Sequence, residues 1–278
     1  MISFFLNIIN LCSIDIMISS IPVVSVLYSS CQYAIMFKFP DLYKKMFKYK
    51  KDEKITRLIT KHGLPDYTSV LKCKSPVIAG IMGTCFKSPI ILLSNCFEEF
   101  EEGIQNTVLL HEIGHLKHED FLTHSVIMTL AVCVFDIYSS VFSLKTLTAL
   151  TALSALVATI GERRADSYAR KHATDQDLLT CRRFFIARDL ANKELYRNET
   201  TFRDKVFFSL NWLYYHIFTG HPFNTTRLGY INQELAKRGV SMADLNKLEL
   251  NKIEHVKNII LKMEREEEKQ KDEKMAAT

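Results

Sequence analysis

Two histidines and a glutamate stand in this chain at the spacing of a metal site. In the run HEIGH, His111 and His115 lie on one face of a helix about a turn apart, so both imidazoles can reach one ion. Glu112 is rotated from that face by one residue, close enough to address a water on the metal without ligating it. A zinc ion lowers the pKa of such a water, and the glutamate takes its proton as the water attacks a carbonyl. The pattern therefore predicts hydrolytic zinc chemistry with Glu112 as the general base.

A five-residue pattern recurs by chance, so the rest of the chain has to supply a third ligand. Glu162 in the run GERRADSYA supplies one, at the start of a second helical segment. Asp166 follows one helical turn later on the same face, where its carboxylate can accept the free N–H of a ligand histidine. The residues predict one zinc ion per chain, held by His111, His115 and Glu162. The alternative is a chance pattern on a helix surface.

The motifs together resemble a known family. HEIGHLKHED followed by ERRAD looks like the HExxH…ExxxD signature of the membrane gluzincins, the group of the HtpX-like heat-shock proteases and the CAAX prenyl proteases. The run HPFNTTR, from His221 to Arg227, is similar to the HPxxxxR element of that group, and the acidic lead-in FEEFEEGIQNTVLLHE also matches. The resemblance covers roughly residues 75–230 in order. The chain length is closer to the short HtpX-like members than to the CAAX proteases, which need many more transmembrane segments.

The resemblance also implies roles for residues around the metal. It assigns the same zinc ligands and the same base as the spacing does, and it places Asp166 in contact with a ligand. His221 would lie near the substrate carbonyl, where a histidine stabilises the developing oxyanion. Arg227 would fix the local acidic network. The implied fold is α+β and predominantly α-helical: a zincin (gluzincin) catalytic domain with a small edge-exposed β-sheet, plus transmembrane helices.

The run SPVIAG would be the edge strand that binds substrate. An extended polypeptide would pair its backbone with the free edge of this strand. The run also resembles the SPxxxG element of the BlaR-type sensor peptidases, a sister group, so the HtpX-like and BlaR-like subgroups both stay open. The residues of this run are Ser75, Pro76, Val77, Ile78, Ala79 and Gly80.

Local patterns predict the elements that position these motifs. Pro76–Gly83 and Ile90–Ser94 are short apolar runs bounded by Ser-Pro and Asn, and they predict two strands joined by a turn. Residues 97–120 carry a helical pattern with an acidic start, and Gly103 is the expected break. A glycine such as Gly114 lowers the stability of a helix, so its presence suggests a close contact there, for example with the backbone of a neighbouring element.

An apolar stretch at the N-terminus predicts a retained membrane anchor. Residues 2–37 contain a single charged residue, Asp15, and Ile16–Phe37 is long enough for one crossing of a bilayer. A signal peptide is the rival interpretation, but it would carry positive charge before the apolar run, whereas here a basic run at residues 38–61 follows it. That basic run places the residues after the anchor on the cytoplasmic side.

Residues 121–160 predict a transmembrane helical hairpin. They carry few charges and fit two crossings, at 122–142 and 145–160, with a turn near Ser143. The alternative is a buried helical hairpin in a soluble protein. Because the proposed ligands before and after this stretch must share one metal, the stretch must begin and end on the same side. This requires an even number of crossings, with the metal site facing the cytoplasm.

The composition excludes other classes of protein. The net charge of +5 is modest, and a basic run beside an apolar segment indicates topology and lipid headgroup contact rather than nucleic-acid binding. The seven cysteines are scattered and form no CxxC pair, which excludes a disulfide framework and a cysteine zinc knuckle. The expected partners are polypeptide substrates and the lipid bilayer, with no nucleic acid.

These observations predict a zinc-dependent, membrane-bound metalloendopeptidase that acts on membrane or misfolded proteins. One alternative is a signalling peptidase that cleaves a specific regulator. Another is a zinc-stabilised membrane scaffold without catalysis, although a scaffold would not need Glu112. The expected organisation is an anchor at 1–37, a basic segment and the first half of the zincin domain at 38–120, the membrane hairpin at 121–160, the second half of the domain at 161–245, and a charged helical tail at 246–278.

Overall fold

The structure is a computed structural model that describes most of the chain from residue 53 onward. The predicted anchor at 1–37, the strand residues 75–78 and the turn near Ser143 lie outside the described residues. The described residues are 53–64, 68–73, 79–84, 87–138, 144–198, 201–202, 205–210, 212, 221–241 and 250–276.

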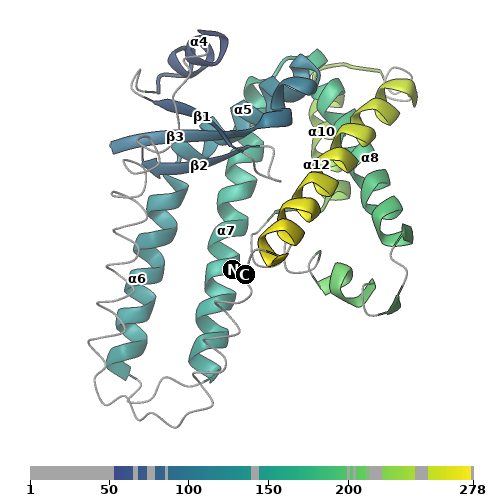
Figure 1. The fold of residues 1–278 in the computed structure, drawn as a ribbon. Coiled ribbons are helices and arrows are strands. Elements are labelled where there is room, and N and C mark those ends of the chain that lie inside the picture. Colours follow the sequence, from purple (N-terminus) through teal and green to yellow (C-terminus); the bar gives the residue numbers. More distant parts are fainter. Residues whose placement is uncertain are drawn as a thin grey trace.

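Helices dominate the fold, and one small sheet lies among them (Figure 1). The described elements are, in chain order, α4 (Glu53–Lys61), β1 (Ser69–Cys73), β2 (Ala79–Thr84), β3 (Lys87–Ser94), the 3₁₀ helix η2 (Asn95–Glu99), α5 (Glu102–Lys117), α6 (Asp120–Tyr138), α7 (Leu144–His172), α8 (Asp175–Asn198), α10 (Asn224–Lys237) and α12 (Leu250–Ala276).

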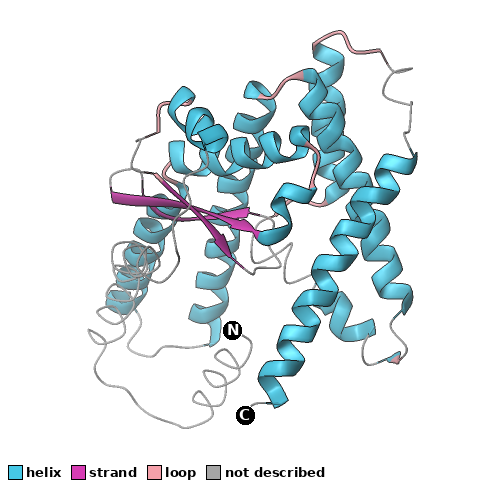
Figure 2. Cartoon of the chain, turned by 45° about the horizontal axis from the view of Figure 1, so that its top comes forward, coloured by secondary structure: helices cyan, strands magenta, loops and turns pink. Residues whose placement is uncertain are grey.

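The sheet has the order β1-β3-β2, with β3 parallel to β1 and antiparallel to β2. The central strand is the most apolar, and its residues Ile90, Ile91 and Leu93 are fully buried. The predicted pair of strands is therefore confirmed for the described residues, and β2 lies at an edge of the described sheet (Figure 2). The strand β1 was not predicted from the sequence. Its five residues include the polar Ser69 and Lys72, and only Val70 and Leu71 form an apolar run.

Helix α5 lies at the centre of the molecule and contacts both α7 and α8. A Cβ added at Gly114 would lie 2.9 Å from the Cα of Ala165, so the backbones of α5 and α7 approach as closely as the glycine suggested. Gly103 is not a break, because α5 begins one residue before it. Instead it lies in the first turn, where a Cβ would lie 2.9 Å from the Cβ of Thr180 on α8.

Helices α6 and α7 lie side by side and extend away from the sheet (Figure 1). Apolar side chains, including Met128, Val132 and Leu150, pack between them. The predicted crossing at 145–160 falls within α7, and the described part of the one at 122–142 lies in α6. However, α7 runs without interruption past Gly161 to His172. Glu162 is therefore inside a long helix rather than at the start of a new one. Among the described residues, no helix is both long enough and apolar enough to cross a membrane.

The C-terminal helix α12 is a structural part of the fold. It packs along α8 (Figure 1), and Lys257 Nζ donates to Glu194 Oε2 over 2.9 Å. Its buried face, which includes Ile253, Val256 and Ile259, belongs to the same core cluster as α8 and α10. Within the predicted charged helical tail, the stretch from Ile253 to Met263 therefore contributes side chains to the core.

Candidate metal centre

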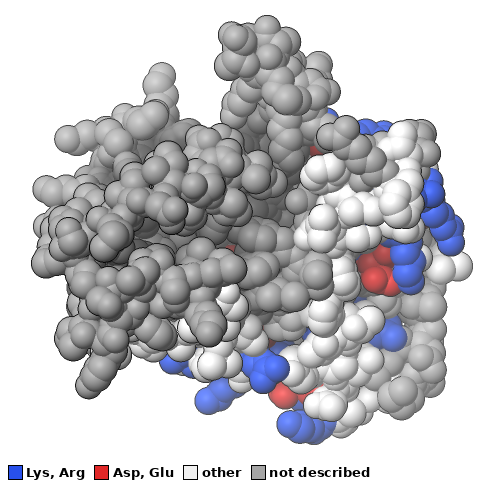
Figure 3. Space-filling view, turned by 90° about the horizontal axis from the view of Figure 1, so that it is seen from below, with Lys and Arg blue, Asp and Glu red and all other residues white. Residues whose placement is uncertain are grey.

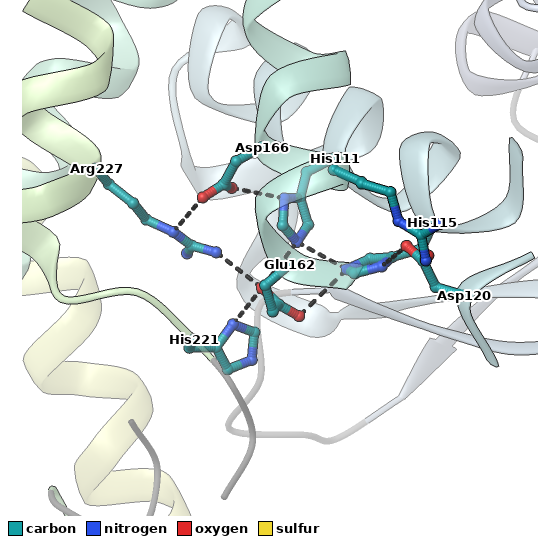
Figure 4. A network of polar contacts seen from close by, with 8 residues as sticks. His111, His115, Asp120, Glu162, Asp166, His221 and Arg227 are labelled. Carbon is teal, nitrogen blue, oxygen red and sulfur yellow. Dashed lines mark hydrogen bonds and ion pairs between the residues drawn. The ribbon is translucent and has the colours of Figure 1, made fainter. Parts of the chain in front are cut away.

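Helices α5 and α7 bring two imidazoles and one carboxylate to a single point (Figure 4). The Nε2 atoms of His111 and His115 lie 3.1 Å apart. Glu162 on α7 faces both of them, with Oε2 3.4 Å from His111 Nε2 and Oε1 3.2 Å from His115 Nε2. All three side chains are nearly inaccessible to solvent. Two nitrogens and one carboxylate oxygen that converge in this way are the donor set that zinc takes in hydrolytic sites, where a fourth position stays open.

The other ring nitrogen of each histidine is held by an aspartate. His111 Nδ1 donates to Asp166 Oδ1 over 2.9 Å, and His115 Nδ1 donates to Asp120 Oδ2 over 2.9 Å. A protonated Nδ1 leaves the Nε2 lone pair of each neutral ring directed at the common point. The two carboxylates thus fix both the tautomer and the ring orientation that metal binding requires, so the residues present fit a zinc ion.

Sequence reasoning found Asp166 but missed Asp120. On an unbroken helix, a residue five positions after His115 would be rotated from it by about 140°. The chain instead turns between α5 and α6, where Glu119 has a positive φ of 49°, and Asp120 becomes the first residue of α6. Asp120 is buried and ion-paired with Arg164 of α7. The available signal was the terminal aspartate of HEIGHLKHED.

Arg227, on α10, bridges the two carboxylates of α7. Its Nε donates to Asp166 Oδ2 and its Nη2 donates to Glu162 Oε2, both over 2.9 Å. Burial alone would raise the pKa of Asp166, but the guanidinium and the His111 ring hold this pKa below its ordinary value. The arginine keeps this nearly buried acidic pair charged.

His221 lies beside the same carboxylate. Its Nδ1 is 2.6 Å from Glu162 Oε2, and the ring is largely buried in the short segment before α10. Burial lowers the pKa of His221 more than Glu162 raises it, so the ring favours the neutral form. Figure 4 shows the ring next to the Glu162 carboxylate, on the side away from Asp166.

Glu112 differs from Glu162 in its protonation chemistry. Burial raises the pKa of Glu112, which lies on α5 beside the two histidines. Burial acts in the same direction on Glu162, but the histidines around it hold the pKa of that carboxyl well below its usual range. The two carboxyl groups of this site thus have pKa values shifted in opposite directions. Glu112 is suited to carry a proton, and Glu162 is suited to stay ionised.

The expected substrate strand is described in part. Ala79 and Gly80 are the first residues of β2, where they pair with Leu93 and Leu92 of β3. The residues before them, 75–78, lie outside the described part of the chain. A Cβ at Gly80 would meet nothing within 4 Å, so open space adjoins the edge strand there.

Comparison with known proteins identifies a family whose model matches most of the chain. A family model described as "Peptidase family M48" matches residues 50–235, a span that includes every residue of the cluster. The chain is also similar to the crystal structure of Ste24p from S. mikatae, with 19% sequence identity and a TM-score of 0.48, over 83% of this chain and 62% of that one. The chain therefore spans less than two thirds of the length of that protein. No curated protein sequence matches it.

Proposed function

Because the chain belongs to peptidase family M48, we propose that it is a zinc-dependent endopeptidase whose metal is held by His111, His115 and Glu162. The observation that carries this proposal is the convergence of two Nε2 atoms and a carboxylate whose histidines are oriented through Nδ1 by buried aspartates. Zinc in this site would acidify a bound water and polarise the carbonyl of the scissile peptide bond.

Glu112 is the general base in this proposal. Its raised pKa brings it closer to the working pH, where a carboxylate takes a proton from the attacking water and returns it to the leaving nitrogen. A neutral His221 carries one N–H, so it would donate to the developing oxyanion only in the tautomer whose proton is not shared with Glu162. Arg227 would hold Glu162 and Asp166 in place throughout the reaction, since it touches both.

The substrate would be an extended polypeptide that pairs with β2. Within the described sheet this strand pairs on one side, with β3, and its other side offers backbone groups to a substrate. Residues Ala79 and Gly80, together with Ser75, Pro76, Val77 and Ile78, would form this contact.

The proposed setting is HtpX-like, at the cytoplasmic side of a membrane and on membrane or misfolded proteins. The motif HEIGHLKHED and the position of the basic run support this setting. The helices α6 and α7 present outward apolar side chains, among them Leu130 and Leu156, that suit contact with lipid.

Zinc content and chelation test the ligand assignment. The purified full chain should digest a casein-type substrate, lose this activity with a zinc chelator and recover it when zinc is restored. The variants His115→Ala and Glu162→Ala should lose zinc, whereas His255→Ala, which removes an exposed histidine of α12, should keep it. Full zinc occupancy in both ligand variants would contradict the assignment.

A further inference from the structure

Exposed large apolar side chains are concentrated in two parts of the described molecule. One is the outer face of α6 and α7. The other is the segment between α8 and α10, whose described residues are 201–202, 205–210 and 212, together with Phe223. In this segment Phe202 is 84% exposed, and Phe207 and Leu210 are each more than half exposed. Scattered apolar residues are ordinary on a surface, but several exposed aromatic side chains in one short segment point to a contact site.

Aromatic contacts join this segment to α8 and to Phe223. Phe208 packs on Tyr196 of α8, with ring centroids 5.9 Å apart. Trp212 stacks on Phe223, with ring centroids 5.2 Å apart and planes inclined by 29°. Phe208 thus anchors the segment on α8, whereas Phe202, Phe207 and Leu210 are exposed.

The segment lies at the same end of the molecule as the exposed apolar side chains of α6 and α7. The segment lies between the ends of α8 and α10 in the lower half of Figure 1, the half into which α6 and α7 extend. On α6, Val126, Leu130 and Val134 recur one turn apart and are exposed, and Leu156 and Ile160 do the same on α7. The two apolar surfaces therefore occupy one end of the molecule. In the view from that end, the described surface has uncharged areas with Lys, Arg, Asp and Glu atoms among and around them (Figure 3).

We infer that the described residues Phe202, Phe207, Leu210 and Trp212, with Phe223, form a membrane contact at the bilayer interface, an inference that rests on the proposed membrane setting. Aromatic side chains with a nearby cation suit the headgroup level of a bilayer, where a ring meets both acyl chains and water. Lys205 provides that cation, and its Nζ lies 5.8 Å from the ring centroid of Tyr196. Phe223 is two residues from His221, so this contact would keep the mouth of the metal site at the membrane surface.

A single native probe tests this placement. Trp212 is the only tryptophan of the chain. The full chain is reconstituted in vesicles of phosphatidylcholine and phosphatidylglycerol that carry bromine either near the headgroup or near the ends of the acyl chains. Selectively excited Trp212 should show blue-shifted emission, weak quenching by aqueous iodide, and stronger quenching by the shallow bromines than by the deep ones.

Three results would overturn the inference. Strong iodide quenching without lipid quenching would place Trp212 in water. Blue-shifted emission that no quencher reaches would mean that protein, from a second copy or from another part of this chain, covers the patch. Stronger quenching by the deep bromines would place the segment in the hydrocarbon core instead of at the interface.

A pair of variants checks that the patch itself makes the contact. The double change Phe207→Ser and Leu210→Ser should raise iodide quenching of Trp212 several-fold in vesicles. The matched change Leu250→Ser removes an exposed leucine of α12 outside the patch and should leave the quenching unchanged. Equal quenching in the double variant and the wild type would contradict the inference. The readout is independent of peptide cleavage, so it separates this proposal from the proposed peptidase function.

Discussion

A glycine near each end of α5 allows a neighbouring helix to pack closely, but the two close contacts have different consequences. At its first turn Gly103 allows α8 to approach, and the contact is with Thr180 and the backbone of Asp177. Near its last turn Gly114 allows α7 to approach, and the contact there sets the distance between the histidines of α5 and Glu162 of α7. Close packing therefore supports the core at one end and the geometry of a ligand set at the other.

The change with the largest expected effect is Gly114→Ala. The new Cβ would lie 2.9 Å from the Ala165 Cα, and a backbone atom cannot move aside as a flexible side chain can. We expect a loss of about 1–3 kcal/mol in the free energy of unfolding, as for other overpacked sites, together with lowered zinc content. Thermal unfolding and metal analysis measure both, and a variant that keeps wild-type stability and zinc would break the comparison.

Removal of either aspartate that orients a ligand histidine should weaken zinc binding. Asp120→Ala and Asp166→Ala each remove the acceptor of a ligand Nδ1–H, and the loss of such a partner costs zinc affinity about 10–100-fold. Competition with a fluorescent zinc chelator gives the affinity. Asp175→Ala is the control, because this half-exposed residue pairs with Arg238 away from the cluster. If the affinity of both site variants equals that of the control, the aspartates do not position the ligands.

Gly103→Ala, at the other end of α5, should destabilise the protein without affecting zinc binding. Its Cβ would meet the Thr180 side chain at 2.9 Å and the Asp177 Cα at 3.1 Å, so we again expect a loss of about 1–3 kcal/mol in stability. Zinc stoichiometry in the remaining folded protein should stay at the wild-type value. A loss of zinc as large as that in Gly114→Ala would show that both ends of α5 control the site.

The smallest effect is expected at Gly229, in the interior of α10. A Cβ there would meet nothing within 4 Å. Gly229→Ala should therefore raise the helix propensity and stabilise the protein by up to about 1 kcal/mol, with unchanged zinc content. This variant shows that the losses at the other two glycines come from close approach and not from the substitution as such, and destabilisation here would remove that distinction.

Helical periodicity explains how much of the site could be predicted. His111, His115, Glu162 and Asp166 follow from spacings of one turn on two helices, and the structure brings their side chains together. Asp120 did not follow, because its position depends on the turn at Glu119, where a non-glycine residue adopts a positive φ. No periodic rule anticipates such a turn.

Tertiary packing limited the prediction of the fold in the same way. The pair β2 and β3 was visible as apolar runs, whereas β1 is short and gains its buried residues only by pairing with β3. The continuity of α7 across Gly161 depends on packing, since a Cβ there would lie 3.3 Å from Asp120 Cγ. The burial of α12 against α8 likewise has no local signal beyond amphipathicity.

The central claim is that Glu112 acts on a zinc-bound water without binding the zinc. Glu112→Gln tests it most directly, because glutamine keeps the shape of the side chain but cannot accept the water's proton. Zinc content should equal that of the wild type, whereas cleavage of a peptide substrate should fall by about 10²–10⁴-fold. In the ligand variant Glu162→Gln, zinc content and cleavage should fall together, and Glu102→Gln, an exposed change on the same helix, should alter neither. Near wild-type cleavage by Glu112→Gln protein that retains its zinc would contradict the account.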